Sequence, residues 1–419
     1  MFPLEQEDYA RTRLTHSIEV LSIAESLGVQ AINIIYAPEN NRFLEKSTSG
    51  KEPLYIPEIP PYLEKRNQIN KLTYINEIPT ILMSAALLHD MGNPPFGHLG
   101  EQIINDWFKY NWSTLNIPLT GSQMDDLQNF DGNAQLLRLV TRLSYVVDEN
   151  GMNLSYPVMA SIIKYPCSSS EIDRRILSKK KVGYFVTEKE VFTDIVTSLG
   201  LRTGYGICRH PLAFLLEAAD DIAYLSADIE DACHKGVLTL EELQAALEEY
   251  NQECVKEQNS TDPIIDQVIN SIDRYKAIAS ENGYPNISDY VIHRLRILIK
   301  GIMIDAMSDA FSKLYKEIMN GTCEQELIDA SSVNNLAKVL RKIESDKIHY
   351  CPEIVESKTR AIVILNKLLS LYVHSILAYN PAKDYNKDTE ENLLYLSLSE
   401  NYRYLCEKAL TSETDEKTI

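Results

Sequence analysis

The chain has 419 residues, 44% hydrophobic and 24% charged, which is the balance of an ordinary globular protein with a sizeable core. Its formal net charge of −19 argues against a surface dominated by nucleic-acid contacts. Single-stranded DNA stays open as a partner, although the acidic charge does not support it. We see no uncharged run of bilayer-spanning length and no signal segment, so we expect a cytoplasmic protein without membrane contact. The seven scattered cysteines contain no CxxC pair and favour reduced thiols over a zinc site or disulfides.

The first helical pattern starts near Thr15, and its apolar spacing predicts a core helix that ends at Gly28. His16 lies in the first turn, where a partly buried structural histidine is the usual interpretation. Arg13 lies just before it, and an arginine fork suits a phosphate as well as an ordinary surface position. Residues 38–75, rich in Pro, Asn, Lys and Glu, are predicted to form a loop inserted between two core helices.

The stretch LLHDMGNPPFGHLGE, residues 87–101, is the most informative part of the chain. An apolar helical run precedes it, so His89 and Asp90 are expected at the C-terminal end of a packed helix, where both could reach one bound ion. The Gly-Asn-Pro-Pro turn that follows stops this helix. In the next helix His98 and Glu101 lie three residues apart and share a face, which suits a base and the carboxylate that orients it.

Another helix is predicted to begin near Asp131 and to carry Asn133 together with two arginines four residues apart. Such an arginine pair is more often a solvated face than a site. Lys164 lies beside a proline that ends a helix, and Lys181 belongs to the lysine cluster of SKKKVGYF. Charge runs of this kind are usually solvated loops, but in so acidic a chain the cluster favours an anionic ligand.

The segment HPLAFLLEAADDIAYLSADIEDA, residues 210–232, predicts a buried helix with proline in its first turn. Asp220, Tyr224 and Asp228 recur every four residues along one stripe of this otherwise apolar helix. Burying an acidic stripe is costly, and a metal ion or an ordered ligand would offset the cost. A solvated acidic face is the alternative.

From residue 237 onward the chain is a series of amphipathic helices, and strand patterns are nearly absent throughout. We therefore predict an all-α fold. We divide it into a helical core at 1–235, which includes the inserted loop, and a C-terminal helical region at 236–419. The C-terminal region has more apolar residues than one helical layer covers, so we expect it to pack on the core and on neighbouring subunits of a homo-oligomer.

His16, His89, Asp90 and Asp220 together form a mixed N/O set that suits a single divalent ion with open positions for substrate or water. Their order, H…HD…D, is that of the HD phosphohydrolases. The surrounding segments narrow the match, because they closely resemble the deoxyguanosine triphosphate triphosphohydrolase (dGTPase) family of that group. These segments are RTRLTHSIEV, LLHDMGNPPFGHLGE, FDGNAQLLRLV and EAADDIAYLSADIEDA, which span residues 11 to about 235.

The resemblance implies an HD-domain helical core with additional C-terminal helices. It also implies metal-dependent hydrolysis of deoxynucleoside triphosphates, preferentially dGTP, to deoxynucleoside and inorganic triphosphate. One Mn²⁺ or Mg²⁺ per subunit would be held by His16, His89, Asp90 and Asp220. Asp221 would lie next to these ligands without binding the ion itself. Members of the family form symmetric oligomers, often hexamers built from dimers.

The same resemblance implies that His98 and Glu101 are the catalytic pair. The side chains expected to contact the substrate fall into two groups, on the polyphosphate and on the deoxyribose. The first group is Asn133, Lys164 and Lys181, with Arg13 as a further phosphate candidate, and the second is Tyr224 and Asp228.

Two other functions stay open from the sequence alone. The first is an HD-type nucleotidase or phosphodiesterase acting on other nucleotides, whose two-metal forms need further histidine ligands; of the remaining histidines inside the chain, only His210 lies near a motif. The second is a non-catalytic, nucleotide-sensing or DNA-binding HD protein. The complete pair of His98 and Glu101 weighs against this second function, and the net charge weighs against DNA.

Overall fold

The protein is described by a computed structural model, and within the described residues it is almost entirely helical. A single two-stranded antiparallel sheet, β1 (Arg202–Thr203) with β2 (Gly206–Ile207), interrupts the helices there. The prediction of an all-α fold is therefore confirmed. The described residues are 11–35, 70–115, 117, 119–144, 150–348, 350–378 and 389–411.

The chain forms two compact units that alternate along the sequence. The unit we call the α9 unit consists of the described parts of Glu5–Leu87 and His210–Glu356. The unit we call the α4 unit consists of Leu88–Arg209 and Ser357–Ile419, again in their described parts. The division predicted between residues 235 and 236 falls inside the α9 unit, directly after α9, and stays a prediction.

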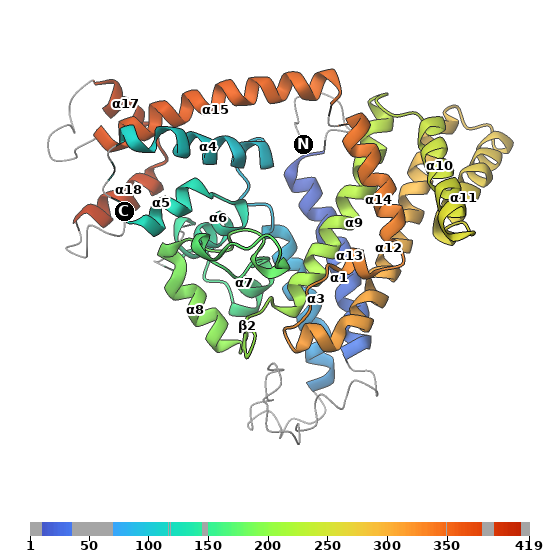
Figure 1. The fold of residues 1–419 in the computed structure, drawn as a ribbon, viewed down its shortest axis with the longest axis horizontal. Coiled ribbons are helices and arrows are strands. Elements are labelled where there is room, and N and C mark those ends of the chain that lie inside the picture. The colour runs from blue at the N-terminus through green and yellow to red at the C-terminus, as the bar shows by residue number, and fades with distance from the viewer. Residues whose placement is uncertain are drawn as a thin grey trace. The chain divides into compact units, whose positions relative to one another are not determined.

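The α9 unit is a bundle built around α9 (Pro211–His234) (Figure 1). Helices α1 (Arg13–Ile35) and α12 (Ile287–Met319) pack against α9 and against each other. The other elements of the unit are α3 (Asn70–Leu88), α10 (Leu240–Gln258), α11 (Pro263–Glu281), α13 (Leu327–Ala330), α14 (Asn334–Ile343) and the π-helical turn Glu344–Ile348.

Helix α9 begins as the sequence predicts, with Pro211 in its first turn. His210 caps it, because its ring Nδ1 accepts a hydrogen bond from the backbone N–H of Leu212 at 3.2 Å. Fifteen of its residues are buried, most of them apolar, and they leave a stripe of carboxylates between them. The helix is thus a core element that also carries charge.

Gly28 does not end α1, so the prediction of a C-terminal cap there was wrong. The helix continues to Ile35, and Gly28 instead lies where α3 comes closest. A Cβ atom at Gly28 would be 2.9 Å from the Cα atom of Pro79, so only glycine permits this approach. The predicted loop at 38–75 lies mostly outside the described residues, and its last residues, from Asn70 onward, are helical.

A network of charged side chains ties α1, α9 and α12 together. Arg296 of α12 donates to Glu230 of α9 and to Glu19 of α1, both at 2.5 Å. Lys300 donates to Glu19 at 2.6 Å, and Arg11 donates to Glu230 at 2.5 Å. Because the two glutamates are largely buried, each needs these cationic partners to offset the loss of hydration.

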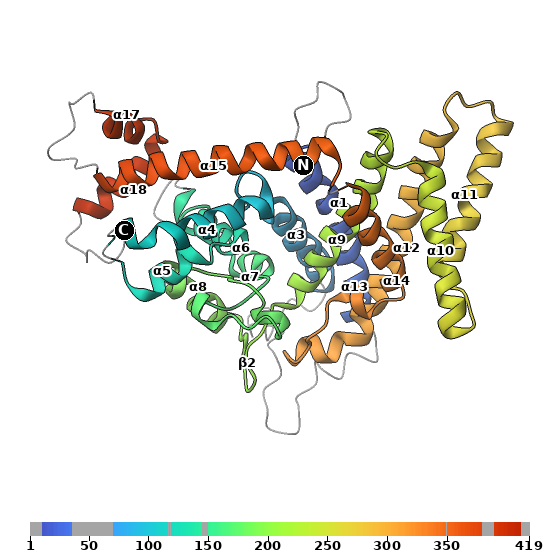
Figure 2. The same ribbon diagram turned by 45° about the horizontal axis from the view of Figure 1, so that its top comes forward.

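In the α4 unit, α4 (Gly97–Leu115) lies alongside α15 (Pro352–Ala378) in both views (Figures 1 and 2). Trp107 joins them: it lies in a cluster with Leu369 and Val373, and its indole N–H donates to Ser370 at 3.1 Å. The other elements are α5 (Gly121–Gln128), α6 (Gly132–Arg138), the π-helical turn Leu139–Leu143, α7 (Tyr156–Ile162), the 3₁₀ turns Ser169–Glu171, Leu177–Lys179 and Val186–Glu188, α8 (Lys189–Ser198), α17 (Glu390–Leu396) and α18 (Glu400–Thr411).

Two helices are long and apolar enough to cross a membrane by length and composition, although the sequence had led us to expect none. One is α1, whose apolar residues pack against α9 and α12 as a core helix does. The other is the stretch Ile354–Ala378 of α15, whose most apolar 18-residue segment is only 17% buried. Its exposed apolar side chains are Val355, Ile362, Val363, Ile364, Leu368, Ile376 and Leu377. We call this set the α15 apolar face.

We predict that Gly28→Ala destabilises the protein while Gly301→Ala stabilises it. In a helix alanine is favoured over glycine by about 1 kcal/mol, and at Gly301 of α12 the added methyl meets nothing within 4 Å. At Gly28 the methyl collides with the backbone of Pro79, and overpacking of this kind costs about 1–3 kcal/mol. Urea unfolding of both variants measures the two effects, and a stabilised Gly28→Ala protein would contradict the close approach.

Candidate metal and catalytic site

His16 lies in the first turn of α1, and the local sequence explains its place. The hydroxyl of Thr15 accepts from the backbone N–H of Thr12 at 2.8 Å, and the hydroxyl of Thr12 accepts from the N–H of Thr15 at 3.2 Å. These two bonds satisfy backbone donors where the helix begins. His16 is then held by its own N–H, which donates to the carbonyl of Thr12 at 3.0 Å.

His89 and Asp90 directly follow the last residue of α3, as predicted. The chain turns sharply after them at Gly92, where a Cβ atom would lie only 2.0 Å from the carbonyl oxygen of Gly132. The amide of Asn93 then reaches back and donates to Oδ1 of Asp90 at 2.6 Å. The turn therefore orients the Asp90 carboxylate.

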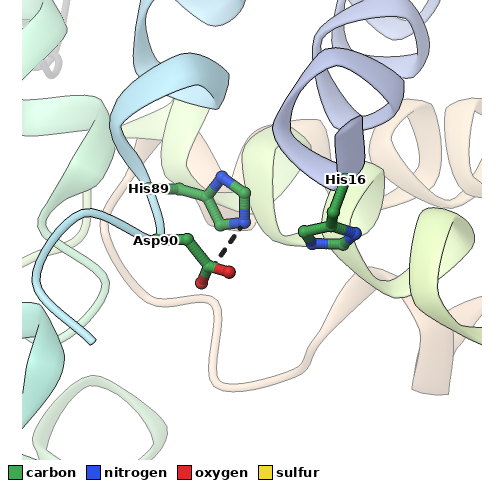
Figure 3. A group of neighbouring side chains, drawn as sticks. All are labelled: His16, His89 and Asp90. Carbon is green, nitrogen blue, oxygen red and sulfur yellow. Dashed lines mark ion pairs between the residues drawn. The ribbon is translucent and has the colours of Figure 1, made fainter. Parts of the chain in front are cut away.

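His16, His89 and Asp90 form one group of metal-ligating side chains (Figure 3). One ligand atom from each lies within 4.8 Å of the others, and Nε2 of His89 is 3.5 Å from Oδ1 of Asp90. Neighbouring ligands of a divalent ion with bonds of about 2.1 Å lie about 3.0–3.4 Å apart. Two imidazoles and a carboxylate also have the mixed N/O chemistry that first-row divalent ions accept, so these residues fit a metal ion.

Asp220, the fourth predicted ligand, is not part of that three-residue group, but its Oδ1 atom is 3.0 Å from Nε2 of His16. This distance lies in the range expected between neighbouring ligands of one ion. Asp221 is turned differently, because Nη2 of Arg341 donates to its Oδ1 at 3.4 Å. The two adjacent carboxylates thus have different partners, and the assignment of Asp220 rather than Asp221 as a metal ligand stays a prediction.

His98 and Glu101 share a face of the first turns of α4, as predicted. Nδ1 of His98 donates to Oε2 of Glu101 at 2.9 Å, and the backbone N–H of Gly132 donates to Oε1 at 2.9 Å. Glu101 is buried, whereas the side chain of His98 is 83% exposed. The carboxylate is therefore fixed on both oxygens, and the imidazole that it holds faces solvent.

The hydrogen bond that His98 donates to Glu101 raises the pKa of His98, although some loss of hydration and the charge of the nearby Lys181 act against the rise. Burial alone would raise the pKa of Glu101. The bonds from His98 and Gly132 and the charge of Lys181 outweigh burial, so the pKa of Glu101 is lowered. The pair therefore consists of a firmly ionised carboxylate and an imidazole of increased basicity.

Lys181 and Asn133 converge on one carboxylate that the sequence analysis had not assigned to the site. Nζ of Lys181 is 3.3 Å from Oδ2 of Asp131 and 3.8 Å from Oε2 of Glu101. The amide of Asn133 donates to Oδ1 of Asp131 at 2.7 Å. The sequence predicted Asp131 only as the start of a helix. Its pairing with Lys181 could not be predicted, because the two residues are fifty positions apart and no local pattern connects them.

Tyr224 lies on α9 with Asp228, and α14 and the π-helical turn that follows it supply partners that the sequence did not reveal. Nε of Arg341 donates to the hydroxyl of Tyr224 at 3.2 Å. Burial raises the pKa of Glu344 to about 8, and a hydrogen bond with the neighbouring Asp228 adds to the rise. Arg341 and Glu344 occur in an ordinary amphipathic pattern, so only tertiary packing shows that they accompany the predicted sugar-facing residues.

The structure puts the other predicted residues in more ordinary surroundings. Arg13 is exposed at the start of α1, and Nζ of Lys164 lies 5.5 Å from the centre of the Tyr165 ring. The two arginines predicted to follow Asp131 are partly exposed and paired. Both approach the buried Glu188, Arg138 at 3.1 Å and Arg142 at 3.7 Å.

Comparison with known proteins shows which family the chain resembles in sequence. The chain is 33% identical to a deoxyguanosinetriphosphate triphosphohydrolase-like protein of Listeria innocua over an alignment of 410 residues. This alignment covers 96% of the present chain and 79% of the relative. A protein of the same name from Synechocystis is 28% identical, over 91% of this chain and 77% of its own length. A deoxyguanosinetriphosphate triphosphohydrolase of Yersinia enterocolitica is 26% identical, over 89% and 72%. No family model matches the chain.

The fold and the His–Asp group define an all-α protein with a candidate site for a metal ion and a base. The 33% sequence identity to the Listeria protein, over most of both chains, narrows this class to one family. The chain belongs to the deoxyguanosine triphosphate triphosphohydrolase family, as its sequence motifs suggested.

We predict that Glu101→Gln lowers the pKa of His98, because an amide cannot stabilise the imidazolium as a carboxylate does. Proton NMR of the histidine rings against pH measures the change, and the exposed His374 of the same unit serves as internal reference. With its folded-state pKa raised, the pair contributes stability that is complete below the ordinary pKa of histidine and is lost as pH rises through the folded-state pKa. An unchanged His98 titration would contradict the assigned hydrogen bond.

Proposed function

We propose that this protein hydrolyses deoxynucleoside triphosphates, preferentially dGTP, to the deoxynucleoside and inorganic triphosphate. The observation that carries the proposal is the group of His16, His89 and Asp90, three donors of metal-binding chemistry within 4.8 Å. The names of the relatives support the substrate class, since several are triphosphohydrolases or triphosphohydrolase-like proteins.

In this proposal His16, His89, Asp90 and Asp220 hold one Mn²⁺ or Mg²⁺ ion. When bound, the ion supplies positive charge to an oxygen of the α-phosphate and so stabilises the charge that develops at phosphorus. Asp221 is not a ligand in this assignment, because Arg341 is its partner.

His98 acts as the general base in this proposal and takes a proton from the attacking water. Glu101 holds the ring by Nδ1, which leaves Nε2 as the atom that receives the proton. Because the imidazole must be unprotonated to act as a base, its raised pKa gives the rate an acid limb that lies above the ordinary pKa of histidine.

The remaining residues bind the two ends of the substrate. Asn133, Lys164 and Lys181 are assigned to the polyphosphate, whose charge they would neutralise, and Arg13 is a further candidate there. Tyr224 and Asp228 are assigned to the deoxyribose. The hydroxyl of Tyr224 accepts from Arg341, which limits rotation of the ring, and a fixed ring against C2′ would exclude a 2′-hydroxyl.

We also propose that the protein is a cytoplasmic homo-oligomer that buries the α15 apolar face between subunits. Exposed apolar surface of this extent is typical of interfaces, and burial between copies removes it from water. The alternative two-metal phosphodiesterase is less well supported, because the ring of His210 is engaged as the cap of α9.

We predict that Asp220→Ala abolishes retention of the metal ion while Asp221→Ala does not. The two residues are adjacent on α9, so the pair is a matched test of which carboxylate is a ligand. Elemental analysis after gel filtration measures the bound metal directly and does not depend on activity. If Asp221→Ala loses the ion and Asp220→Ala keeps it, the assignment within the pair is wrong.

We predict that the purified protein with Mn²⁺ or Mg²⁺ releases inorganic triphosphate, and no monophosphate or pyrophosphate, from dGTP. The ratio of kcat/KM for dGTP to that for GTP should be on the order of 100 or more, and Tyr224→Ala should reduce it. Ion chromatography of the products across the four dNTPs and GTP tests both parts. Release of pyrophosphate would mean cleavage between the α- and β-phosphates and would contradict the proposed reaction, and equal use of GTP and dGTP would exclude the role given to Tyr224.

A further inference from the structure

The carboxylate of Asp131 connects two parts of the α4 unit that the proposed function uses. Asp131 is buried with 6% of its surface exposed. Its Oδ1 accepts from the backbone N–H and from the side-chain amide of Asn133, at 2.9 and 2.7 Å, and its Oδ2 is 3.3 Å from Nζ of Lys181. A single carboxylate therefore holds both a lysine and an amide that are assigned to the polyphosphate.

The residue after Asp131 is bonded to the catalytic pair. The backbone N–H of Gly132 donates to Glu101, and a Cβ atom at Gly132 would lie 3.0 Å from Oε1 of Glu101 and 2.3 Å from Oδ1 of Asn93. The start of α6 thus fixes Glu101 through its backbone and Lys181 through its side chain. A shift of Asp131 would therefore affect the positions of both Glu101 and Lys181.

Lys181 lies between two anions, and their competition decides where it rests. Its ammonium is 3.3 Å from Asp131 and 3.8 Å from Glu101, while His98 already donates to the same Oε2 atom of Glu101. Burial disfavours the charged form of Lys181, but the two carboxylates outweigh burial and raise its pKa. Without the charge of Asp131, Glu101 would be the nearest anion for this ammonium.

We propose that Asp131 is a positioning residue that holds Lys181 at the polyphosphate subsite and keeps it from displacing His98 on Glu101. This inference rests on the proposed function for the identity of the substrate. A second role of Asp131 is plain from the structure, since it caps α6. The two roles need different properties of the side chain: a cap needs only an acceptor oxygen, and asparagine caps as well as aspartate, whereas control of Lys181 needs negative charge.

Asp131→Asn therefore separates the two roles, because it keeps the cap and removes the charge. We expect a melting temperature close to that of the unchanged protein, a lowered pKa of His98, and affinity for inorganic triphosphate that is weaker by about tenfold, the size of one lost charge-assisted bond. Histidine NMR and titration calorimetry with inorganic triphosphate and Mg²⁺ measure the last two. In Asp131→Asn/Lys181→Met the pKa of His98 should recover, because the competing ammonium is gone.

Asp262→Asn is the matched control. Asp262 also caps a helix, accepting from the N–H groups of Ile264 and Ile265, but the partner of its Oδ2 is the amide of Asn335 rather than a lysine. This variant should change neither the His98 titration nor triphosphate binding. If Asp131→Asn behaves like Asp262→Asn, the positioning role is refuted and Asp131 is a cap alone.

Two further outcomes keep the inference separate from folding and from the proposed function. Should Asp131→Asn fail to fold, Asp131→Ser repeats the test with and without Lys181→Met, because serine also caps a helix but carries no charge. A pKa of His98 that does not fall in Asp131→Ser, or that does not recover when Lys181 is also replaced, overturns the inference. If the unchanged protein binds no triphosphate, the proposed function fails, while the titration of His98 continues to test the balance between Asp131, Lys181 and Glu101.

Discussion

The structure depends on the need to pair carboxylates that lie on a buried helix. Most of α9 faces apolar neighbours, yet it carries the largely buried Asp221 and Glu230 and the half-exposed Asp220. An unpaired charge at either of the two largely buried positions would be too costly to keep. Each of the three carboxylates has a partner from another segment: His16 for Asp220, Arg341 for Asp221, and arginines for Glu230. These pairings fix how α1, α12 and α14 pack on α9. The same ion pairs and hydrogen bonds therefore determine both the packing of the unit and the positions of its charged side chains.

The fold class and several features of the candidate site could be predicted, because they depend on residues that are close together in the sequence. Helical periodicity without strand alternation gave the all-α class, and the start of α9 followed from a proline in the first turn. The spacing of His98 and Glu101 on one helix face predicted a hydrogen bond that the structure contains. The turn after Asp90 was equally readable, because Gly-Asn-Pro-Pro cannot continue a helix.

The features that could not be predicted depend on contacts between distant segments. Gly28 looks like a helix end in sequence, and only the approach of Pro79 shows that it is a crossing point of two helices. Arg341 lies 120 residues from Asp221, in a helix with no distinguishing pattern. The pairing of Asp131 with Lys181 is of the same kind. Local sequence states which side chains are available, and the fold decides which of them meet.

The cap of α9 makes the protein sensitive to acid at the first turn of this helix. Burial lowers the pKa of His210 to about 4, so the folded chain keeps this ring neutral while an unfolded chain would protonate it. Between the ordinary pKa of histidine and pH 4 the unfolded chain therefore binds an additional proton, and stability falls as the pH falls. Once protonated, Nδ1 can no longer accept from Leu212, and a cation would oppose the positive end of the helix dipole. Acid would thus unwind the helix that bears Asp220 from its first turn.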